Sequence, residues 1–407
     1  MRRSTGGGDV DSSEITVVHI ITRFINGGAD ENTLEACNWS AQRGDLVYLF
    51  IGRAFDQAIV DKLDDRVRVV MIPDLVNPIS PLKDLKAFLQ IRNALVSVRP
   101  DIVHTHTSKA GILGRAAAHS TGVPGIIHGI HIAPFQNVGL LKRHLYLALE
   151  KLAARWTDAF ISVSEGMRRA YLNEGIGAPE RHSVIHSGMK LSKYRASAPN
   201  DWHSLLGRSV DSQKPKIVLM LAGLERRKRH AELIDAFVRV FAVVPDAILV
   251  LAGGGRDREI VEQRVKASPF RDRICLLGHV EDPGSLIALA DIAVHCAVRE
   301  GLPRVMVQYL AGGLPVVMTQ LPGVGSLIVD GVNGRVVDQD NFDELSSAIV
   351  ETLIDAEKLE ALRRGARRKD VSSWDVSNTG RKQQSVYDDV LRRSAAVSLD
   401  NGVRVMP

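Results

Sequence analysis

The stretch that decides the fold is IAVHCAVREGLPRVMVQ, which covers residues 292–308. Its first residues are apolar, as in a buried strand, and from Pro303 the pattern becomes helical. A proline suits the first position of a helix, whose free amide groups then point back toward the preceding loop. That loop carries one carboxylate, Glu300. The stretch therefore predicts a strand–loop–helix unit that presents a carboxylate beside a helix N-terminus.

The chemistry of this loop suits a phosphorylated sugar ligand. The amides of residues 301–305 can hold a phosphate, while Glu300 accepts hydrogen bonds from neutral hydroxyls. Gln308 lies about 8–12 Å further along the helix, at about 1.5 Å per residue. This separation matches a nucleotide ribose at one end and a sugar at the other. The plainer interpretation is a glutamate that merely precedes a helix.

Strand and helix patterns alternate on both sides of this unit. In the first half, the runs that predict strands are Ile15–Ile21, Asp45–Ile51, Val67–Ile72, Ile102–His106, Gly125–His128 and Ala159–Val163. In the second half they are Ile217–Ala222, Ile248–Ala252, Ile274–Leu277, Ile292–His295, Val316–Met318 and Gly334–Val337. Helical patterns separate them, which is typical of right-handed crossovers in a parallel sheet. We expect an α/β fold with two doubly wound, Rossmann-like domains facing each other across a cleft.

A polar, irregular stretch in the middle of the chain sets the expected domain boundaries. We predict a first domain over residues 15–192, a linker over 193–215 and a second domain over 216–376. An amphipathic segment at about 377–391 is expected to pack back on the first domain. Open α/β sheets bind ligands beyond the carboxyl ends of their strands, so the residues after each strand are the candidates for a site.

The composition is that of an ordinary globular protein. Of the 407 residues, 45% are hydrophobic and 24% are charged, which excludes a disordered or fibrous chain. No apolar run reaches the roughly 18 residues of a membrane-spanning helix, and no signal peptide is recognisable. Three cysteines, Cys37, Cys275 and Cys296, lie far apart and predict neither disulfides nor a zinc site. We expect a cytoplasmic protein.

The net charge of +5 is concentrated in the first half of the chain. Residues 1–195 carry 24 Lys and Arg against 19 Asp and Glu, whereas residues 196–407 carry 28 of each. A basic half favours an anionic partner, such as a phosphorylated substrate, a membrane surface or a nucleic acid. A surface that is merely basic explains the charge equally well.

One basic segment, Leu140–Trp156, has the pattern of an amphipathic helix. Most such helices bury their apolar stripe within their own domain, although a basic rim can still meet anionic lipid. The stripe consists of Leu141, Leu145, Ala148, Leu149, Leu152 and Trp156, and the cations on the other faces are Lys142, Arg143, Lys151 and Arg155.

Polar residues and glycines gather at the expected strand ends of the first half. They are Gly27 and Gly28 after the first strand, His104, His106 and Lys109 around the end of the fourth, and His128 and His131 around the fifth. Paired glycines let backbone amides approach a ligand, although the pattern is not the G-x-G-x-x-G of dinucleotide-binding enzymes. The histidines do not predict a metal, because no Cys or Glu completes a ligand set at helical spacing. Imidazoles that simply cap strands are an equal alternative.

In the second half, four consecutive cations, Arg226 to Arg229, follow the first expected strand. Such a loop suits a diphosphate, although a solvated basic loop is the simpler explanation. Gly253 to Gly255 follow the next strand and permit either close backbone approach or a plain turn.

These stretches together resemble the retaining family-4 glycosyltransferases of the GT-B architecture, from about Ile15 to Leu391. The matching stretches are Gly27–Asp30, His104–Gly114, Ile161–Glu165, Val184–Gly188, Glu300–Pro303, Ala311–Val317 and Gly331–Gly334. The resemblance implies an enzyme of the retaining hexosyltransferase type. It would move a sugar from a nucleotide diphosphate sugar, UDP by the habits of the family, to a hydroxyl of a polysaccharide, glycolipid or lipid-linked saccharide. No cofactor and no metal are implied, and neither Asp9-Val10-Asp11 nor Asp338-Gln339-Asp340 stands where a donor metal would bind.

The resemblance also assigns roles to residues. The catalytic candidates are His128, near the transferred sugar, Lys228, on the diphosphate, and Glu300, on the sugar hydroxyls. The donor-binding set is Gly28, Arg227, Lys228, Gly254, Val280, Glu300, Gly301, Leu302, Pro303 and Gln308, and the acceptor-side set is Gly27, His106 and Lys109. The expected partners are the nucleotide sugar, the saccharide or lipid-linked acceptor and an anionic membrane surface on the cytoplasmic side, without nucleic acid.

Two positions depart from the family pattern. Gly223 stands where the family has an arginine, and Gln308 replaces the second glutamate of its Glu–seven residues–Glu pattern. An amide can still bond a ribose hydroxyl, so an altered nucleotide preference is one consequence. A catalytically degenerate partner subunit of a polysaccharide assembly complex is another. A nucleotide-sugar epimerase shares the architecture but needs acid and base carboxylates, of which Glu300 is the clear candidate.

Overall fold

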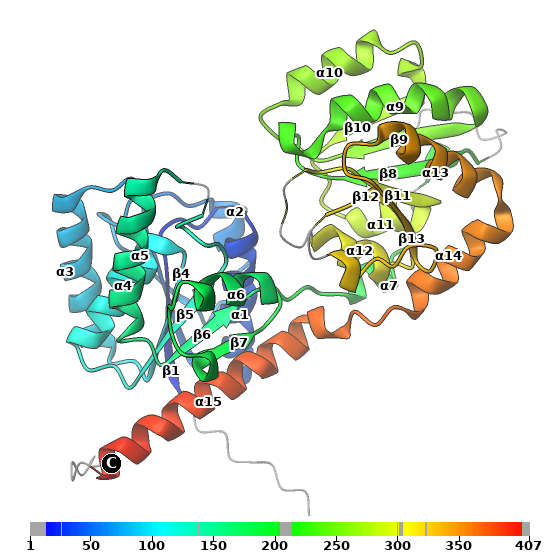
Figure 1. The fold of residues 1–407 in the computed structure, drawn as a ribbon. Coiled ribbons are helices and arrows are strands. Elements are labelled where there is room, and N and C mark those ends of the chain that lie inside the picture. Colours follow the sequence, from blue (N-terminus) through cyan, green and yellow to red (C-terminus); the bar gives the residue numbers. More distant parts are fainter. Residues whose placement is uncertain are drawn as a thin grey trace, which may run out of the picture. The chain divides into compact units, whose positions relative to one another are not determined.

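The computed structural model describes residues 14–25, 27–136, 138–199, 201–203, 214–298, 300, 304–321 and 324–400. It divides into two compact units. The first unit consists of residues 1–189 together with 376–407, and the second unit consists of residues 190–375. Each unit is built on its own parallel sheet, as the sequence predicts (Figure 1).

The sheet of the first unit has seven strands in the described part of the chain, in the order β3-β2-β1-β4-β5-β6-β7. All neighbours pair in parallel. The strands are β1 (Thr16–Ile21), β2 (Leu46–Ile51), β3 (Arg68–Met71), β4 (Ile102–His106), β5 (Gly125–Ile130), β6 (Ala159–Ser162) and β7 (His182–Val184). The order reverses between β1 and β4, which places a topological switch point there.

Helices cover both faces of this sheet because successive strand residues point to opposite sides. Val18 and Ile20 pack with α3 and α4, whereas Val17 packs against Tyr387 of the last helix. The helices of the unit are α1 (Gly28–Arg43), α2 (Gln57–Val60), α3 (Pro81–Val98), α4 (Ser108–Ser120), α5 (Leu140–Ala154) and α6 (Glu165–Asn173), with a 3-10 turn η1 (Pro179–Arg181) and the returning helix α15 (Val376–Asp400).

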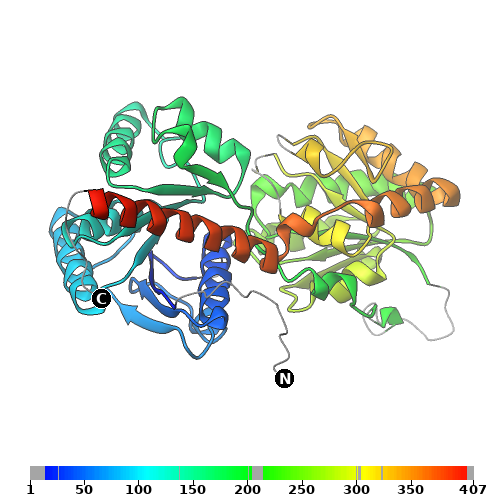
Figure 2. The same ribbon diagram turned by 90° about the horizontal axis from the view of Figure 1, so that it is seen from below.

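Helix α15 returns to the first unit after the chain has completed the second. It is longer than the segment 377–391 expected from the sequence and lies across the sheet of the first unit (Figure 2). The amide of Val376 donates to the Met189 carbonyl at 3.0 Å, where the chain left this unit. Gly380 packs against Trp39 of α1 so closely that a Cβ would overlap the indole ring.

The sheet of the second unit has six strands among the described residues, in the order β10-β9-β8-β11-β12-β13. They are β8 (Lys216–Leu221), β9 (Ala247–Ala252), β10 (Ile274–Gly278), β11 (Ile292–His295), β12 (Val316–Thr319) and β13 (Gly334–Val337). All pair in parallel, and the order reverses between β8 and β11. This reversal is the switch point of the second unit.

The helices of the second unit follow the same alternation. They are α7 (Ser192–Arg195), α9 (His230–Val243), α10 (Arg258–Ala267), α11 (Pro283–Leu289), α12 (Arg304–Ala311), α13 (Phe342–Ile354) and α14 (Ala356–Arg368), with 3-10 turns η2 (Arg226–Lys228), η3 (Arg271–Arg273), η4 (Val324–Ser326) and η5 (Ser372–Trp374). The helical pattern of the sequence over Asp343–Arg364 predicts one continuous helix, and this prediction is wrong, because the segment forms two helices. Asp355 separates them in an extended conformation and its carboxylate caps α14 by accepting from the Lys358 amide. Helix α7 begins at Ser192, one residue before the stretch expected to be a linker, and continues into it. Residues 200 and 204–213 of that stretch lie outside the described residues.

Within the described ranges, no helix combines the length and the apolar character needed to cross a membrane.

The close contact between Gly380 and Trp39 predicts that Gly380→Ala destabilises the docking of α15. Forcing a methyl group into a filled space costs about 1–3 kcal/mol of folding stability. We therefore expect the midpoint of the thermal unfolding transition of the first unit to fall by several degrees. Gly166→Ala in α6 is the control, because a Cβ there would lie 3.7 Å from its nearest neighbour. Equal midpoints for the two variants in differential scanning calorimetry would contradict the tight packing of α15.

Candidate functional site

The candidate site of the second unit lies at its topological switch point. Open parallel sheets bind ligands where neighbouring strands lead away in opposite directions, beyond their carboxyl ends. Here β8 leads into the turn η2, which carries Arg227 and Lys228, and β11 leads into the loop that carries Glu300. The sheet order therefore brings together side chains that lie about 70 residues apart in the sequence.

The Glu300 carboxylate is surrounded by three nitrogen groups. Its Oε1 is 3.0 Å from Nη1 of Arg227 and also contacts Nζ of Lys228. Its Oε2 is 2.9 Å from Nε2 of His295. The side chains of Lys228 and Glu300 are each 10% exposed, so this is a largely desolvated charge cluster with an opening to solvent. Such a cluster can exchange one anion for another.

His295 is neutral in this arrangement. Burial, assisted by the nearby charge of Lys228, lowers its pKa to about 3. A carboxylate can only accept hydrogen bonds, so Nε2 must carry the proton that it donates to Glu300. The imidazole fixes the orientation of the carboxylate without adding a charge.

The pKa of Lys228 is also lowered, to about 8. The main cause is burial, and the Arg227 guanidinium acts in the same direction, whereas Glu225 and Cys296 raise the pKa. A partly buried lysine of this kind is poised to gain an anionic partner, because a phosphate would restore its charged form.

Backbone contacts hold the cationic turn against the loop after β11. The amide of Val298 donates to the Arg227 carbonyl at 3.0 Å, and the Cys296 thiol donates to the Lys228 carbonyl at 3.3 Å. Arg229, which follows, adopts the left-handed conformation with a φ of 61°. These contacts fix where Lys228 and Arg227 point.

The glycines after β9 allow two loops of the second unit to touch. A Cβ at Gly253 would overlap the Ala222 carbonyl, and one at Gly255 would overlap the Leu224 backbone. Gly254 lies between them, and its carbonyl accepts from the Leu224 amide at 2.8 Å. Gly223, by contrast, has no atom within 3.5 Å of an added Cβ position, so the backbone there has room for a side chain.

Two of the other expected donor-binding residues lie among the described residues of the second unit. Val280 is half-buried two residues after β10, and Gln308 is half-buried in α12. Gly28 is the first residue of α1 in the first unit, with open space where a Cβ would be. Gly301, Leu302 and Pro303 lie outside the described residues.

The histidine and acceptor-side candidates of the first unit are more enclosed than the sequence suggests. His128 is buried, with Nδ1 2.9 Å from the Thr105 hydroxyl, and its Cε1 lies 2.6 Å from the Cβ position of Gly111. The His106 ring nitrogens are each 3.0 Å from another imidazole, those of His19 and His131.

Gly27 and Lys109 lie at helix starts of the same unit. Gly27 caps the N-terminus of α1. The Lys109 ammonium is engaged by Asp84 at 2.5 Å and by the Pro78 carbonyl, which ties α4 to the start of α3. Only in the second unit does the structure join the expected residues in one cluster within the described residues.

Reasoning from the sequence assigned no role to His295. The residue lies in the stretch that decides the fold, five positions before Glu300. Its place as the last residue of a buried strand, at the switch point, was the available signal. The tautomer of His295 and its hydrogen bond to Glu300 could be recognised only in the folded structure.

Comparisons with known proteins agree with this architecture. A glycosyl transferase 4-like domain model matches residues 27–188, and a glycosyl transferases group 1 model matches residues 207–369. The chain is 27% identical over 338 residues to the UDP-Gal:alpha-D-GlcNAc-diphosphoundecaprenol alpha-1,3-galactosyltransferase of Escherichia coli, which covers 82% of this chain and 87% of that protein. It is 26% identical over 385 residues to the phosphatidyl-myo-inositol mannosyltransferase of Mycobacterium tuberculosis, with 92% and 96% covered.

The fold is similar to that of Anabaena HepE, solved in complex with UDP and glucose. The TM-score is 0.75 at 20% sequence identity, and the match covers 92% of this chain and 100% of HepE.

The lowered pKa of Lys228 predicts that UDP binding depends on pH. The ammonium is charged below about pH 8 and neutral above it, so attraction for a diphosphate is lost as the pH rises. We expect the UDP association constant, measured by calorimetry, to fall about tenfold from pH 7 to pH 9.

Lys228→Arg is the matched control, because a guanidinium stays charged over this range and should remove most of the pH dependence. The same pH dependence in Lys228→Arg and the wild type would show that another group is responsible.

Proposed function

Because this chain belongs to the family-4 GT-B glycosyltransferases, which join a glycosyl transferase 4-like domain to a group 1 domain, we propose that it transfers a hexose from a UDP-sugar to a hydroxyl of a lipid-linked saccharide. The single observation that carries the proposal is the cluster of Lys228, Arg227, His295 and Glu300 at the switch point of the second unit.

In this proposal, the cations serve the diphosphate of the donor. Lys228 and Arg227 both pair with Glu300 in the structure, Arg227 also pairs with Glu225, and a diphosphate would compete for the same two cations. The carboxylate would then be available for hydroxyl groups of the sugar, with His295 still orienting it. Cations already in place stabilise the charge that develops on the leaving UDP, so the reaction needs no metal at the phosphates.

We further propose that the configuration at the anomeric carbon is retained. With the donor bound, Glu300 would accept hydrogen bonds from His295 and from sugar hydroxyls, and a carboxylate occupied in this way is a poor nucleophile. This argues against Glu300 forming a glycosyl–enzyme bond. The bond from the anomeric carbon to the phosphate oxygen would break while the acceptor oxygen bonds on the same face. The hydroxyl proton would pass to the departing phosphate oxygen.

The names of the relatives support the choice of substrates. The Escherichia coli relative is named for a UDP-galactose donor and a diphosphoundecaprenol-linked acceptor. The Mycobacterium tuberculosis relative is named for a phosphatidyl-myo-inositol acceptor. A hexose donor and an acceptor that carries a lipid are therefore the substrates to test first.

Glu300→Gln tests the proposed transfer. The amide keeps the size of the side chain but loses the charge that holds the cations and the sugar hydroxyls. We expect kcat/KM for transfer from UDP-galactose or UDP-glucose to fall by about 10²-fold or more. Glu351→Gln, an exposed carboxylate of the same unit that also pairs with two cations, should leave the rate unchanged.

The same assay separates the alternatives that Gly223 and Gln308 raise. UDP binding without transfer to any acceptor, and without hydrolysis of the donor, would favour a partner subunit. Interconversion of the free UDP-sugar without acceptor would favour an epimerase. Transfer at wild-type rate in Glu300→Gln would contradict the role given to the carboxylate.

We also propose that α5 contacts an anionic membrane surface. The apolar stripe expected to be buried is instead exposed: Leu141 is 87% exposed, Leu145 47% and Leu152 43%. The buried face of α5 consists of Leu147, Glu150, Ala153 and Ala154, and Glu150 pairs with the buried Arg115 at 2.7 Å. Exposed leucines beside Lys142 and Lys151 suit a lipid surface, and each cation contributes about 1 kcal/mol near anionic lipid.

Charge reversal in α5 tests membrane binding. We expect wild-type protein to sediment with liposomes that contain phosphatidylglycerol at low salt, and to be released at high salt. Lys142→Glu combined with Lys151→Glu should abolish sedimentation. Arg392→Glu combined with Arg393→Glu, on α15, makes the same change in net charge and should reduce it far less. Equal losses in both double variants would mean that net charge, and not α5, determines binding.

A further inference from the structure

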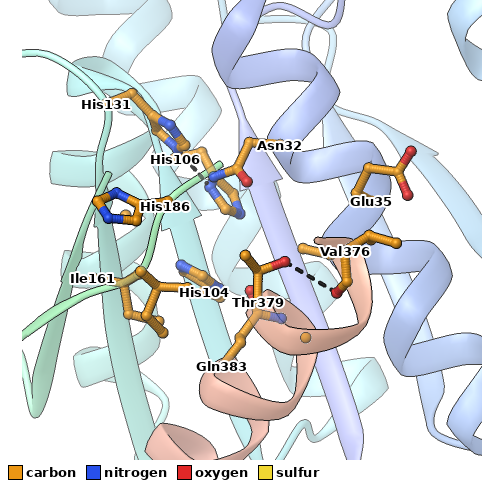
Figure 3. A pocket seen from close by; sticks show the side chains of 14 residues that line it. Asn32, Glu35, His104, His106, His131, Ile161, His186, Val376, Thr379 and Gln383 are labelled. Atoms are coloured by element: carbon orange, nitrogen blue, oxygen red, sulfur yellow. Dashed lines mark hydrogen bonds between the residues drawn. The ribbon is translucent and has the colours of Figure 1, made fainter. Parts of the chain in front are cut away.

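Three histidines meet on one face of the sheet in the first unit. His19 in β1 is the register partner of His104 in β4, and His106 lies two residues further on the same face. All three are at most 2% exposed. This is the face that α1 and α15 cover, so the group lies between the sheet and the returning helix. Figure 3 shows two of the three histidines, His104 and His106, in the pocket that Thr379 and Gln383 of this helix also line.

The imidazoles are close enough to share one ligand. A ring nitrogen of each lies within 4.8 Å of a ring nitrogen of the other two. His19 Nδ1 and His106 Nε2 are 3.0 Å apart, and the ring centroids of His104 and His106 are 4.3 Å apart. Zinc–nitrogen bonds of about 2.0–2.1 Å in a tetrahedral site place ligand nitrogens about 3.3 Å apart. The third imidazole would therefore have to move closer to the other two to complete the set of ligands.

Each of the three rings is neutral and offers a lone pair. Burial lowers the pKa of His19 to about 3 and the pKa of His104 and His106 well below the ordinary value. His104 Nε2 is buried and has no hydrogen-bond partner among the described residues. A bound cation would satisfy the lone pair of this nitrogen.

Two of the rings, those of His104 and His106, are already held by hydrogen bonds from their other nitrogen, as in many metal sites. The Tyr387 hydroxyl lies 2.8 Å from His104 Nδ1, and His131 Nε2 lies 3.0 Å from His106 Nδ1. When Nδ1 of each ring donates to these partners, Nε2 is left as the ligand atom. Metal-binding histidines commonly donate their second nitrogen in this way, which fixes both tautomer and ring orientation.

We propose that His19, His104 and His106 form a binding site for a zinc-class divalent transition metal in the first unit, oriented by Tyr387 and His131. Three imidazole nitrogens suit Zn²⁺ or Co²⁺ and exclude a preference for Mg²⁺ or Ca²⁺, which take oxygen ligands. A cavity of about 20 Å³, bordered by His104, His106 and His131, has room for one water as a fourth ligand.

The metal would link β1, β4 and, through Tyr387, helix α15. Its role would be structural, because the three ligands lie on strands that are buried in the core of the first unit. The inference does not rest on the proposed transfer reaction.

Cobalt binding to the full-length chain, freed of any histidine tag and treated with a chelator, tests the site. We expect one Co²⁺ per chain with the visible absorption of a tetrahedral cobalt centre, and zinc should displace it. Saturating zinc should raise the thermal midpoint of the wild type by about 5 °C. Wild-type protein without stoichiometric binding or the cobalt spectrum would overturn the proposal whatever the variants do.

Variants locate the metal. His104→Gln and His106→Gln should lose the cobalt spectrum and the shift in midpoint, whereas His119→Gln, an exposed histidine of the same unit, should retain both. Tyr387→Phe should weaken metal affinity about 10–100-fold while keeping the spectrum, as expected of an orienting partner. A spectrum unchanged in a folded His104→Gln and His106→Gln would place the metal elsewhere and overturn the assignment.

Discussion

Both units depend on the burial of a parallel sheet on its two faces. Such a sheet leaves little room for polar side chains along its strands, so they gather where the strands end or where their order reverses. In the first unit the reversal lies between β1 and β4, and in the second between β8 and β11. The histidines of the first unit and the charged cluster of the second lie at these two places. The same constraint therefore produces both groups of polar residues.

The charged cluster of the second unit and the histidines of the first unit differ in how they offset the cost of burying polar atoms. In the second unit, Lys228 keeps a charge by pairing with Glu300, and His295 supports that carboxylate as a neutral donor. A buried ion pair with access to solvent can exchange its anion for a ligand, because the cations need a partner of either kind. In the first unit the imidazoles lose their charge instead. Neutral imidazoles retain lone pairs, and these are what a soft cation binds.

Helix α15 completes the first unit with residues from the end of the chain. The chain leaves the first unit at Met189, builds the second, and returns at Val376, where one backbone hydrogen bond connects the two points. Gly380 allows α15 to lie directly on Trp39, and Tyr387 reaches His104. Residues 283 positions apart thus share one hydrogen bond, and the last helix completes the core of the unit in which the chain began.

Local patterns in the sequence predict much of this protein. Runs such as Ile102–His106 and Ile292–His295 are strands at the expected positions, because period and side-chain shape act within a few residues. Glu300 and Lys228 could be considered for a site because each follows a strand, and all strands of a parallel sheet end at one edge. The resemblance to the family then implied their roles toward a donor. The sequence did not predict the break between α13 and α14 at Asp355, because the helical pattern continues through this position. The carboxylate of Asp355 caps α14 and so starts a new helix there.

Only the tertiary structure decided which of these residues meet. The pairing of β1 with β4 brings His19 to His104 and His106 across more than 80 positions, and no spacing in the sequence encodes that neighbour. Leu141 is exposed because the face of α5 that carries Glu150 is the one that is buried. Glu150 pairs there with Arg115 of α4, a partner that the amphipathic pattern of α5 does not reveal. The sequence by itself determined the elements and the chemistry at their ends, because those depend on neighbours along the chain. Strand order determined the contacts, because hydrogen bonds between strands join residues that the sequence keeps apart.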